Sequence, residues 1–456
     1  MPLDGSRLLK FLSRKSAMKW RHLSASSIVL PRRVAAVATL ACIGVLAALL
    51  ATAAWRLGRG SSEKETLPAA PLSVAGALHA PDLRGFARAL VPRPFMFPAD
   101  HGSHPEYRTE WWYYTGNLTA SDGRQFGFQL TFFRSALAPP PAPSATAPAA
   151  LAPPAGVRSS AWATRQVWFA HFAVTDAGGH RFLAYERWER QALGLAGAEA
   201  SPFRVWVGPW SAAAGPEVAG TPPMHLAAGV AEAAVDLVVT TALPPVPQGD
   251  RGLSAKSAEP GNASYYYSLP RLVATGTLRL GGERVAVTGL AWMDREWSTS
   301  SLAPGEVGWD WFGLQLDDGW ELMLYRLRRG PAAPPQAPAA AAAGLADPAS
   351  LATLIAPDGR TTLLPLGALR FAETGTWTSP AGHVRYPSGW RLTLPGAGPA
   401  SFDLTVRPLL ADQELRLSFH YWEGAVAASG THGGRPVTAR GYVELTGYGA
   451  LGEGER

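Results

Sequence analysis

An unbroken run of four large aromatic residues constrains this chain most. Glu110 is followed by Trp111-Trp112-Tyr113-Tyr114. Bulky aromatic side chains favour β-strands, in which successive side chains point to opposite faces of the sheet. Because this strand carries aromatics on both faces, both must be covered, as in a barrel wall that packs against a second layer. The run therefore predicts a strand between two apolar layers.

Two later runs mix indoles with acids in a similar way. Residues 291–300 read Ala-Trp-Met-Asp-Arg-Glu-Trp-Ser-Thr-Ser, and residues 308–313 read Gly-Trp-Asp-Trp-Phe-Gly. Aromatic rings supply apolar area with polar edges, whereas acids among them are unfavourable to bury unless they are paired. The pattern indicates an apolar pocket with a few polar side chains.

Short strands and tight turns account for most of the remaining sequence. Residues 125–132 alternate cleanly, with Phe126, Phe128, Leu130 and Phe132 on one face. Dipeptides typical of hairpin turns separate strand-like runs at Asp122-Gly123, Gly178-Gly179, Gly281-Gly282, Asp318-Gly319, Asp358-Gly359 and Gly433-Gly434. No long amphipathic helix follows residue 55. We expect an all-β protein built from antiparallel meanders, as barrels or curled sheets.

The positive charge is concentrated at the N-terminus. Residues 1–33 hold eight Lys and Arg against Asp4 alone, a net charge of +7, so the remainder of this +6 chain sums to −1. A near-neutral folded part offers no basic field to attract nucleic acid. Nucleic-acid binding is therefore not expected.

A membrane segment is expected directly after the basic region. Residues 34–55 carry no charge, and as a helix they would span about 33 Å, enough to cross a hydrocarbon core. The basic residues before the segment keep the N-terminus cytoplasmic under the positive-inside rule. We expect a single-pass signal anchor in a bacterial inner membrane, with the folded part in the periplasm. A cleaved signal peptide followed by secretion is the alternative.

Composition outlines the domain organisation. Residues 56–94 are rich in Ala, Pro and Gly and are expected to form a stalk or linker. The Ala/Pro tracts at 136–159 and 331–350 are expected to be long surface loops. A Ser/Gly/Pro stretch near residue 300 predicts one domain at 95–300 and a second at 301–456. The single cysteine, Cys42, lies in the apolar segment, which leaves the exported part without disulfides or a thiolate metal site.

Several Trp-rich motifs, in order, resemble one known family. Residues 97–116 look like the opening motif of the AttH-like, carotenoid 1,2-hydratase-related secreted proteins, and 168–176 like that family's next strand. Residues 293–298 and 308–312 resemble its central motifs, and 441–448 its ending. The resemblance implies two lipocalin-like antiparallel β-barrel domains. Some members hydrate a terminal carotenoid double bond, and others are associated with ABC-transporter permeases, so membership alone does not define an activity.

The hydratase members suggest acid chemistry for the Trp-rich runs. Hydrating an alkene needs a carboxyl group that keeps its proton in an apolar pocket, with indole faces to stabilise the cation. Strand alternation places Asp294 and Glu296 on one face and Arg295 on the other. Asp294 is the first candidate acid, followed by Glu296 and then Asp310. A salt bridge from the neighbouring Arg295 would ionise Asp294 and disable it. In the structural alternative, Asp294 and Glu296 pair with Arg295 or Arg326 and fix the register of the barrel.

The aromatic motifs also supply candidate ligand-binding residues, which are His104, Tyr107, Glu110, Trp111, Trp112, Tyr114, Trp292, Trp309 and Trp311. The alternative is that the tryptophans form the core and that Glu110 is a buried partner of backbone or arginine groups. His101 and His104 have a weak zinc-like spacing, and we expect no metal. No phosphate-binding loop or nucleophile elbow is present, so no cofactor is expected.

Two functions from different classes remain open. The first is a membrane-anchored carrier whose barrel binds a lipid, isoprenoid or similar apolar ligand, with an ABC-transporter permease as a partner. The second is a carotenoid 1,2-hydratase-like lyase that adds water by the acid catalysis of Asp294. A third possibility is a purely structural envelope protein, which barrels without an open cavity would support.

Overall fold

The computed structural model describes residues 72–73, 83–140, 162, 164–215, 222–241, 243–299, 302–303, 305–330 and 349–449. All of them belong to one compact unit, Pro71–Arg456. The predicted basic segment 1–33, the predicted membrane segment 34–55 and most of both Ala/Pro tracts lie outside the described residues. Within the described ranges, no helix combines the length and apolar character needed to cross a membrane.

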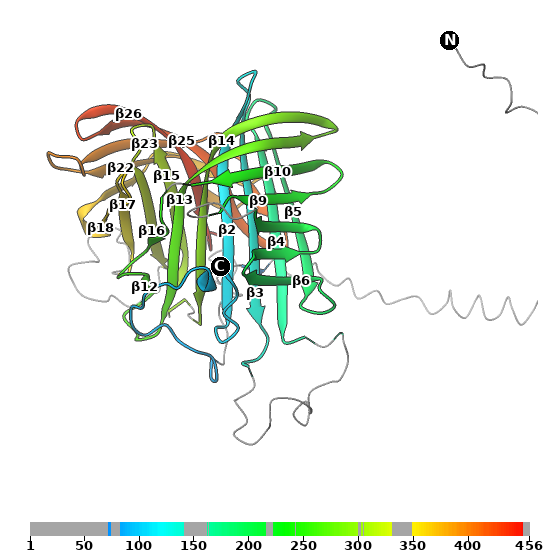
Figure 1. Cartoon of the computed structure of the whole chain (residues 1–456). Helices are drawn as coiled ribbons and strands as arrows, with labels where there is room; N and C mark the ends of the chain where they lie inside the picture. Colours follow the sequence, from blue (N-terminus) through cyan, green and yellow to red (C-terminus); the bar gives the residue numbers. More distant parts are fainter. Residues whose placement is uncertain are drawn as a thin grey trace, which may run out of the picture. The chain divides into compact units, whose positions relative to one another are not determined.

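Antiparallel strands dominate the described residues, which confirms the all-β prediction (Figure 1). The first large sheet has 13 strands, which are β2 (Thr109–Ala120), β3 (Gln125–Ala136), β4 (Gln166–Asp176), β5 (Arg181–Arg190), β6 (Ala196–Ala200), β7 (Phe203–Val207), β8 (Trp210–Ala214), β9 (Met224–Gly229), β10 (Ala233–Thr240), β11 (Val246–Pro247), β12 (Leu253–Ala255), β13 (Ala263–Leu280) and β14 (Glu283–Ser298).

The second large sheet has 11 strands, which are β1 (Leu72–Ser73), β15 (Glu306–Leu316), β16 (Glu321–Arg329), β17 (Leu351–Ile355), β18 (Thr361–Pro365), β19 (Arg370–Glu373), β22 (Trp390–Leu394), β23 (Phe402–Pro408), β24 (Glu414–Arg416), β25 (Phe419–His432) and β26 (Arg435–Leu445). The remaining described elements are the pair β20 (Thr376–Thr378) and β21 (Arg385–Pro387) and the 3-10 turns η1 (Ala99–His101) and η3 (Leu366–Ala368).

Sequence-adjacent strands pair through tight turns in both large sheets. The order is β5-β4-β3-β2-β14-β13-β10-β9-β8-β7-β6 in the first sheet and β18-β17-β16-β15-β26-β25-β23-β22-β19 in the second. All six predicted turn dipeptides connect paired strands. The chain passes from one sheet to the other between Ser298 and Glu306. The division into two domains at this point stays a prediction.

Hydrophobic alternation explains how each sheet forms its own core. On β10, Val235, Leu237 and Val239 are buried, while Asp236 and Thr240 between and after them are exposed. The predicted β3 face of Phe126, Phe128, Leu130 and Phe132 is likewise buried in the core of the 13-stranded sheet. A second core of Phe, Leu and Trp side chains lies in the 11-stranded sheet.

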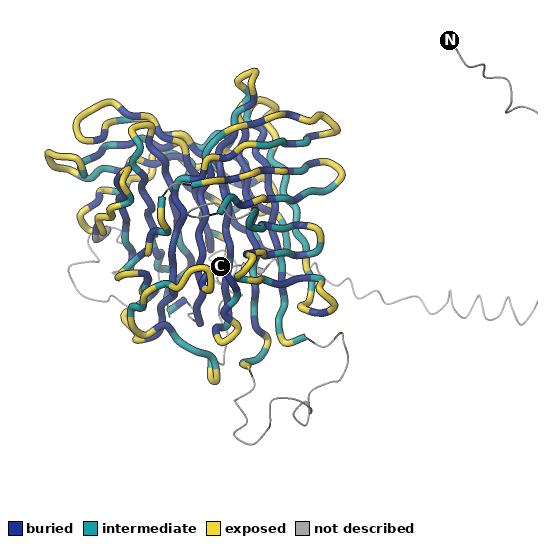
Figure 2. The backbone as a smooth tube through the Cα atoms, viewed as in Figure 1, coloured by how far each residue is buried: buried dark blue, intermediate teal, exposed yellow. Residues whose placement is uncertain are grey.

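A third apolar layer joins the two sheets, and β2 has one face in it. Trp112 and Tyr114 lie in the core of the 13-stranded sheet, whereas Tyr113 packs with Trp292 and Trp311 in the layer between the sheets. The central strands are therefore buried along most of their length (Figure 2). The aromatic run predicted this arrangement, since a strand with rings on both faces needs cover on both.

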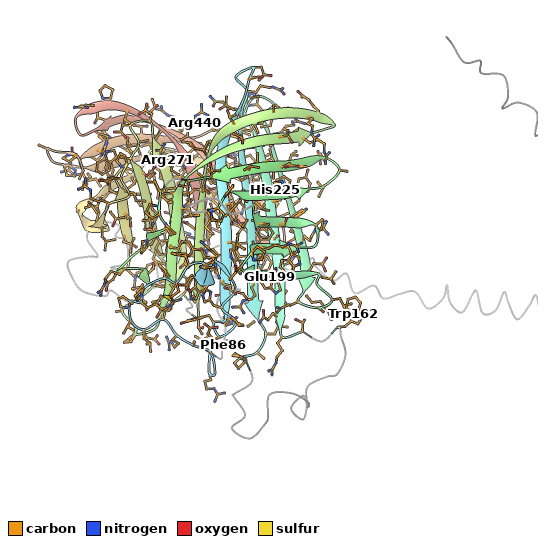
Figure 3. All side chains as sticks on the ribbon, in the orientation of Figure 1. Phe86, Trp162, Glu199, His225, Arg271 and Arg440 are labelled. Atoms are coloured by element: carbon orange, nitrogen blue, oxygen red, sulfur yellow. The ribbon has the colours of Figure 1, made fainter. Side chains whose placement is uncertain are left out.

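Backbone proximity and polar contacts hold the sheets together. A Cβ atom added to Gly127 on β3 would lie 2.5 Å from the Cβ of Ala425 on β25, so only glycine permits this approach. Asn117 on β2 donates to the carbonyl of Gly441 on β26 at 2.9 Å. Near the top of the view in Figure 3, Arg271 binds Glu321, and Arg440 donates to Thr119 at 2.8 Å.

Candidate functional site

A cavity of about 310 Å³ lies between the two sheets. The 13-stranded sheet and its loops contribute Thr109, Glu110, Trp111, Tyr113, Phe133, Arg134, Ser135, Leu137, Val167, Phe169, His171, Trp188, Lys256, Tyr266, Asp294, Glu296 and Ser298. The 11-stranded sheet and the connection to it contribute Leu302, Trp309, Trp311, Tyr325, Phe419, Tyr421 and Glu444. Eleven of these 24 residues are Trp, Tyr or Phe, and ten carry polar or charged side chains. The Trp-rich runs correctly predict a pocket walled by aromatic rings, but it holds more polar groups than they indicate.

Asp294 is the acid that these runs place in the cavity. Its Oδ1 accepts hydrogen bonds from Ser268 at 2.5 Å and from the indole of Trp292 at 2.7 Å, and its Oδ2 accepts one from Tyr266 at 2.7 Å. Burial raises the pKa of Asp294 to about 7, although the three donors lower it. At neutral pH a large fraction of Asp294 therefore carries a proton.

The predicted interference from Arg295 does not occur. Alternation along β14 turns Arg295 away from Asp294, into the core of the 13-stranded sheet. Its guanidinium pairs with Glu110 and lies over the ring of Trp112, 3.9 Å from the ring centroid. Arg295 therefore pairs with Glu110 and forms no salt bridge that would ionise Asp294.

Glu296 is in the cavity wall but is paired. The Lys256 ammonium lies 2.7 Å from its Oε1, and Ser264 donates to the same oxygen. Both side chains of the ion pair are almost completely buried, at 9% and 6% exposed. Glu296 therefore follows the structural alternative, in which a cation neutralises the acid, with Lys256 in place of an arginine.

Asp310 is separated from the cavity. Its oxygens contact Arg326 at 3.2 Å and Arg328 at 3.0 Å, and Tyr448 donates to it at 2.9 Å. Trp309 and Trp311, on the opposite face of β15, line the cavity. This is the separation that strand alternation predicts.

Glu110 lies at the centre of a buried charge cluster. Arg134 and Arg295 both donate to it, and the backbone N–H of His104 reaches its two oxygens at 3.1 and 3.0 Å. Burial by itself raises the pKa of Glu110, but the two arginines hold it well below its ordinary value. Glu110 is therefore ionised and fixed, as a buried partner of arginine groups.

The histidines of the opening motif belong to the same cluster. His104 stacks on Trp297 with ring centroids 3.9 Å apart, and its ring nitrogens face Asp100 at 3.1 Å and Arg295 at 3.0 Å. The His101 ring lies 2.7 Å from the Tyr267 hydroxyl. Within the part of the chain that is described, no group of His, Cys, Asp or Glu has an arrangement that could hold a metal ion.

The other predicted ligand-binding residues divide between cavity and core. Trp111, Trp309 and Trp311 line the cavity beside Glu110. Trp292 lies in the layer between the sheets and reaches the cavity through its hydrogen bond to Asp294. Tyr107, Trp112 and Tyr114 are packed in the core of the 13-stranded sheet, and His104 stacks beside them.

The comparisons with known proteins agree with the motifs. The sequence matches the family model described as AttH-like over residues 88–448. The chain belongs to the AttH-like family. A crystal structure assigned to AttH from Nitrosomonas europaea is 31% identical with a TM-score of 0.63, and the match covers 80% of this chain and 99% of that one.

A second solved structure shares the fold of this AttH-like protein. Kievitone hydratase from Nectria haematococca is 16% identical with a TM-score of 0.56, and the match covers 79% of this chain and 96% of that one. At this identity the likeness concerns the fold alone. Among curated proteins, no match to the chain was found.

Sequence reasoning missed the second acid of the AttH-like cavity. Glu444 on β26 lines the cavity, and the Trp309 indole donates to its Oε1 at 3.1 Å. Burial raises the pKa of Glu444 to about 8. Glu423 is directly opposite it on β25 and accepts a hydrogen bond from Tyr113, and burial raises its pKa as well. A lone acid between Val443 and Leu445 in an apolar strand was the available signal.

A histidine and a lysine of the cavity were also missed as wall residues. His171 on β4 lies with one ring nitrogen 2.7 Å from the Tyr421 hydroxyl, and burial lowers the pKa of His171 to about 4. It is therefore neutral near pH 7. Lys256 follows β12, in a loop whose position near Glu296 no local pattern reveals.

Where the cavity wall reaches the surface, it is formed by stacked aromatic rings. Phe169 stacks on Phe133 and on Trp188 with centroids 4.5 Å apart in each case, and on Phe419 of the other sheet at 5.2 Å. Trp188 and Leu137 are exposed at 41% and 65%, so this wall reaches the surface. Apolar ring faces therefore line the cavity as far as the surface.

Proposed function

We propose that the cavity binds an apolar, unsaturated small molecule and that Asp294 catalyses the addition of water to one of its double bonds. The single observation that carries this proposal is the state of Asp294. It lines an aromatic cavity, has no cationic partner among the described residues, and has a pKa that burial raises to about 7. A carboxyl group that is still protonated near neutral pH can act as a general acid.

The proposed reaction conserves protons. Asp294 transfers its proton to one alkene carbon, and the π electrons form the new C–H bond and leave a cation on the other carbon. A water oxygen then forms the C–O bond to that carbon, and the proton released from the water returns to the Asp294 carboxylate. The donors Ser268, Tyr266 and Trp292 are already oriented to stabilise the transient carboxylate.

The surroundings support a cationic intermediate. The indole faces of Trp309 and Trp311 and the phenol rings of Tyr113 and Tyr325 line the same cavity. Aromatic faces stabilise a desolvated cation by about 2 kcal/mol. A hydratase with the same fold suits this proposal, but at 16% identity the argument rests on Asp294 itself.

A carrier function is the second candidate, and the surface wall of stacked rings favours it. Apolar side chains leading from the surface into the cavity suit uptake and release of a lipid or isoprenoid. Under this proposal residues 34–55 anchor the protein in the inner membrane, the folded part is periplasmic, and an ABC-transporter permease exchanges the ligand.

Native mass spectrometry of the full-length protein, with extraction of the bound ligand, separates the two candidates. The purified protein is incubated with an acyclic carotenoid or with the extracted ligand in isotopically labelled water. Incorporation of one labelled water by the wild type but not by Asp294→Asn supports the hydratase. Asp236→Asn is the control, because Asp236 is an exposed acid on β10 that does not line the cavity.

The remaining outcomes are equally informative. A ligand that binds unchanged to the wild type and Asp294→Asn, but is lost in Trp111→Ala, supports the carrier and refutes the hydratase. A wild type that neither retains nor converts any apolar ligand refutes both.

A further inference from the structure

Two acids of the cavity face each other from different sheets without a cationic partner. Asp294 is on β14 and Glu444 is on β26. Among the described residues, no Lys, Arg or His forms a salt bridge with either of them, whereas Glu296 pairs with Lys256 at 2.7 Å. Their hydrogen-bond partners are hydroxyl and indole groups, which do not cancel a negative charge.

Neighbouring indoles of β15 direct both acids toward the same space. Trp309 donates to Glu444 at 3.1 Å, and Trp311 donates to the Tyr266 hydroxyl at 3.1 Å, which in turn donates to Asp294 at 2.7 Å. Residues two apart on a strand share a face and are separated by about 7 Å. Besides burial, the Asp294 carboxylate raises the pKa of Glu444 by charge repulsion, so the two carboxyl groups lie close enough to act on the same part of the cavity.

The other charges of the cavity wall are compensated. Lys256 is paired with Glu296, and Arg134 is paired with Glu110. His171 is neutral near pH 7, because burial lowers its pKa to about 4, and its Nε2 is buried without a hydrogen-bond partner in the described structure. No positive charge of the wall is left to attract an anion.

The wall already stabilises one ammonium group. The Lys256 nitrogen lies 4.2 Å from the ring centroid of Tyr325 and 5.7 Å from that of Tyr266. Both rings line the cavity, together with Trp309 and Trp311. Ring faces attract cations and are indifferent or repulsive toward anions. The rings therefore favour the same sign of charge as the two acids.

We propose that this cavity, when Asp294 and Glu444 are ionised, selects apolar cations: a hydrophobic molecule with a tertiary or quaternary ammonium group binds with its nitrogen between the two carboxylates. Fatty acids and other apolar anions are rejected. The inference deepens the proposed function, because the carbocation of a hydration reaction would occupy the same place as the ammonium nitrogen.

Isothermal titration calorimetry of the full-length protein with three phenylalkyl probes of different charge tests the selectivity. The probes are (2-phenylethyl)trimethylammonium, its neutral carbon isostere (3,3-dimethylbutyl)benzene, and the anion 4-phenylbutanoate. Measurements are made about one pH unit above the pKa of Glu444, which burial raises to about 8. We expect the ammonium to bind at least about tenfold more tightly than the neutral isostere, and no measurable binding of the anion.

Variants locate the effect. Asp294→Asn and Glu444→Gln should each reduce the preference for the ammonium several-fold, whereas Asp236→Asn, which removes an exposed acid on β10, should leave it unchanged. Equal affinity of the wild type for the ammonium and its isostere would by itself overturn the proposal. So would a preference that survives in both cavity variants.

The outcome is independent of the hydration assay. Ammonium selectivity without hydration of any alkene would support the cation site and refute the hydratase. Hydration without ammonium selectivity would refute the cation site and leave the hydratase standing.

Discussion

Glu110→Gln should destabilise this protein more than any exposed substitution of the same kind. Glu110 and its partners Arg134 and Arg295 all have side chains that are 0% exposed. Glutamine keeps the shape of the side chain but removes its charge. Two guanidinium groups then remain in the core without a counterion, and the new amide group faces one of them with a donor where an acceptor is needed.

The expected magnitude follows from the burial of the cluster. Removing one partner of a buried ion pair costs about 3–5 kcal/mol, because the remaining charge is desolvated and uncompensated. Here one carboxylate serves two arginines, so we expect a loss at the upper end, about 5 kcal/mol. Since typical domains are stable by about 5–15 kcal/mol, the variant should lie near the limit of folding.

Urea unfolding followed by tryptophan fluorescence measures the change in the free energy of unfolding. Glu283→Gln is the control, because Glu283 forms a comparable contact with Arg124, 2.7 Å apart, at the surface. It should leave stability within the error of the measurement. A loss below about 1 kcal/mol in Glu110→Gln would refute the reasoning, since it would mean that the arginines find water or other acceptors.

Three further predictions concern the cavity and the contact between the sheets. Relative to Asp294→Asn, the wild type should lose up to about 4 kcal/mol of stability between pH 4 and pH 8, because burial raises the folded-state pKa of Asp294 from 3.8 to about 7. Urea unfolding of both proteins across this pH range measures the loss. Lys256→Met should cost about 3 kcal/mol at pH 7 in the same assay, since it leaves the Glu296 carboxylate buried alone. Gly127→Ala should lower stability by about 1–3 kcal/mol, because its methyl group would lie 2.5 Å from Ala425, and adding Ala425→Gly should restore much of the loss; no recovery in the double variant would disprove the proposed contact.

Local patterns in the sequence were sufficient for the strands and turns. Glycine-containing dipeptides mark the hairpins because a reversal of the chain within two residues needs backbone angles that glycine adopts without strain. The two faces of residues 292–297 also follow from local alternation, which placed Asp294 apart from Arg295 before any partner was known.

Long-range partners were beyond these patterns. Glu110 meets Arg295 across 185 positions of sequence, and Asp294 shares a cavity with Glu444 from the other sheet. Short-range sequence patterns reveal neither pairing, because alternation along a strand determines only the face of the sheet on which a side chain lies. Which face of the other sheet lies opposite depends on packing of the whole unit. Lys256 could therefore not be assigned to the site from sequence, and Glu444 could be recognised only as a lone acid in an apolar strand.

Both halves of the chain are needed to form the cavity. The strands that contribute Asp294 belong to one sheet and those that contribute Glu444 to the other, and each sheet contains a core of its own. A fragment ending near Ser298 would therefore retain much of its core but only half of a binding site. For the same reason, exchanging halves between two relatives with different ligands would join walls that did not evolve to face each other. Ligand preference in this fold is a joint property of both halves, and an engineer who wishes to change it must alter them together.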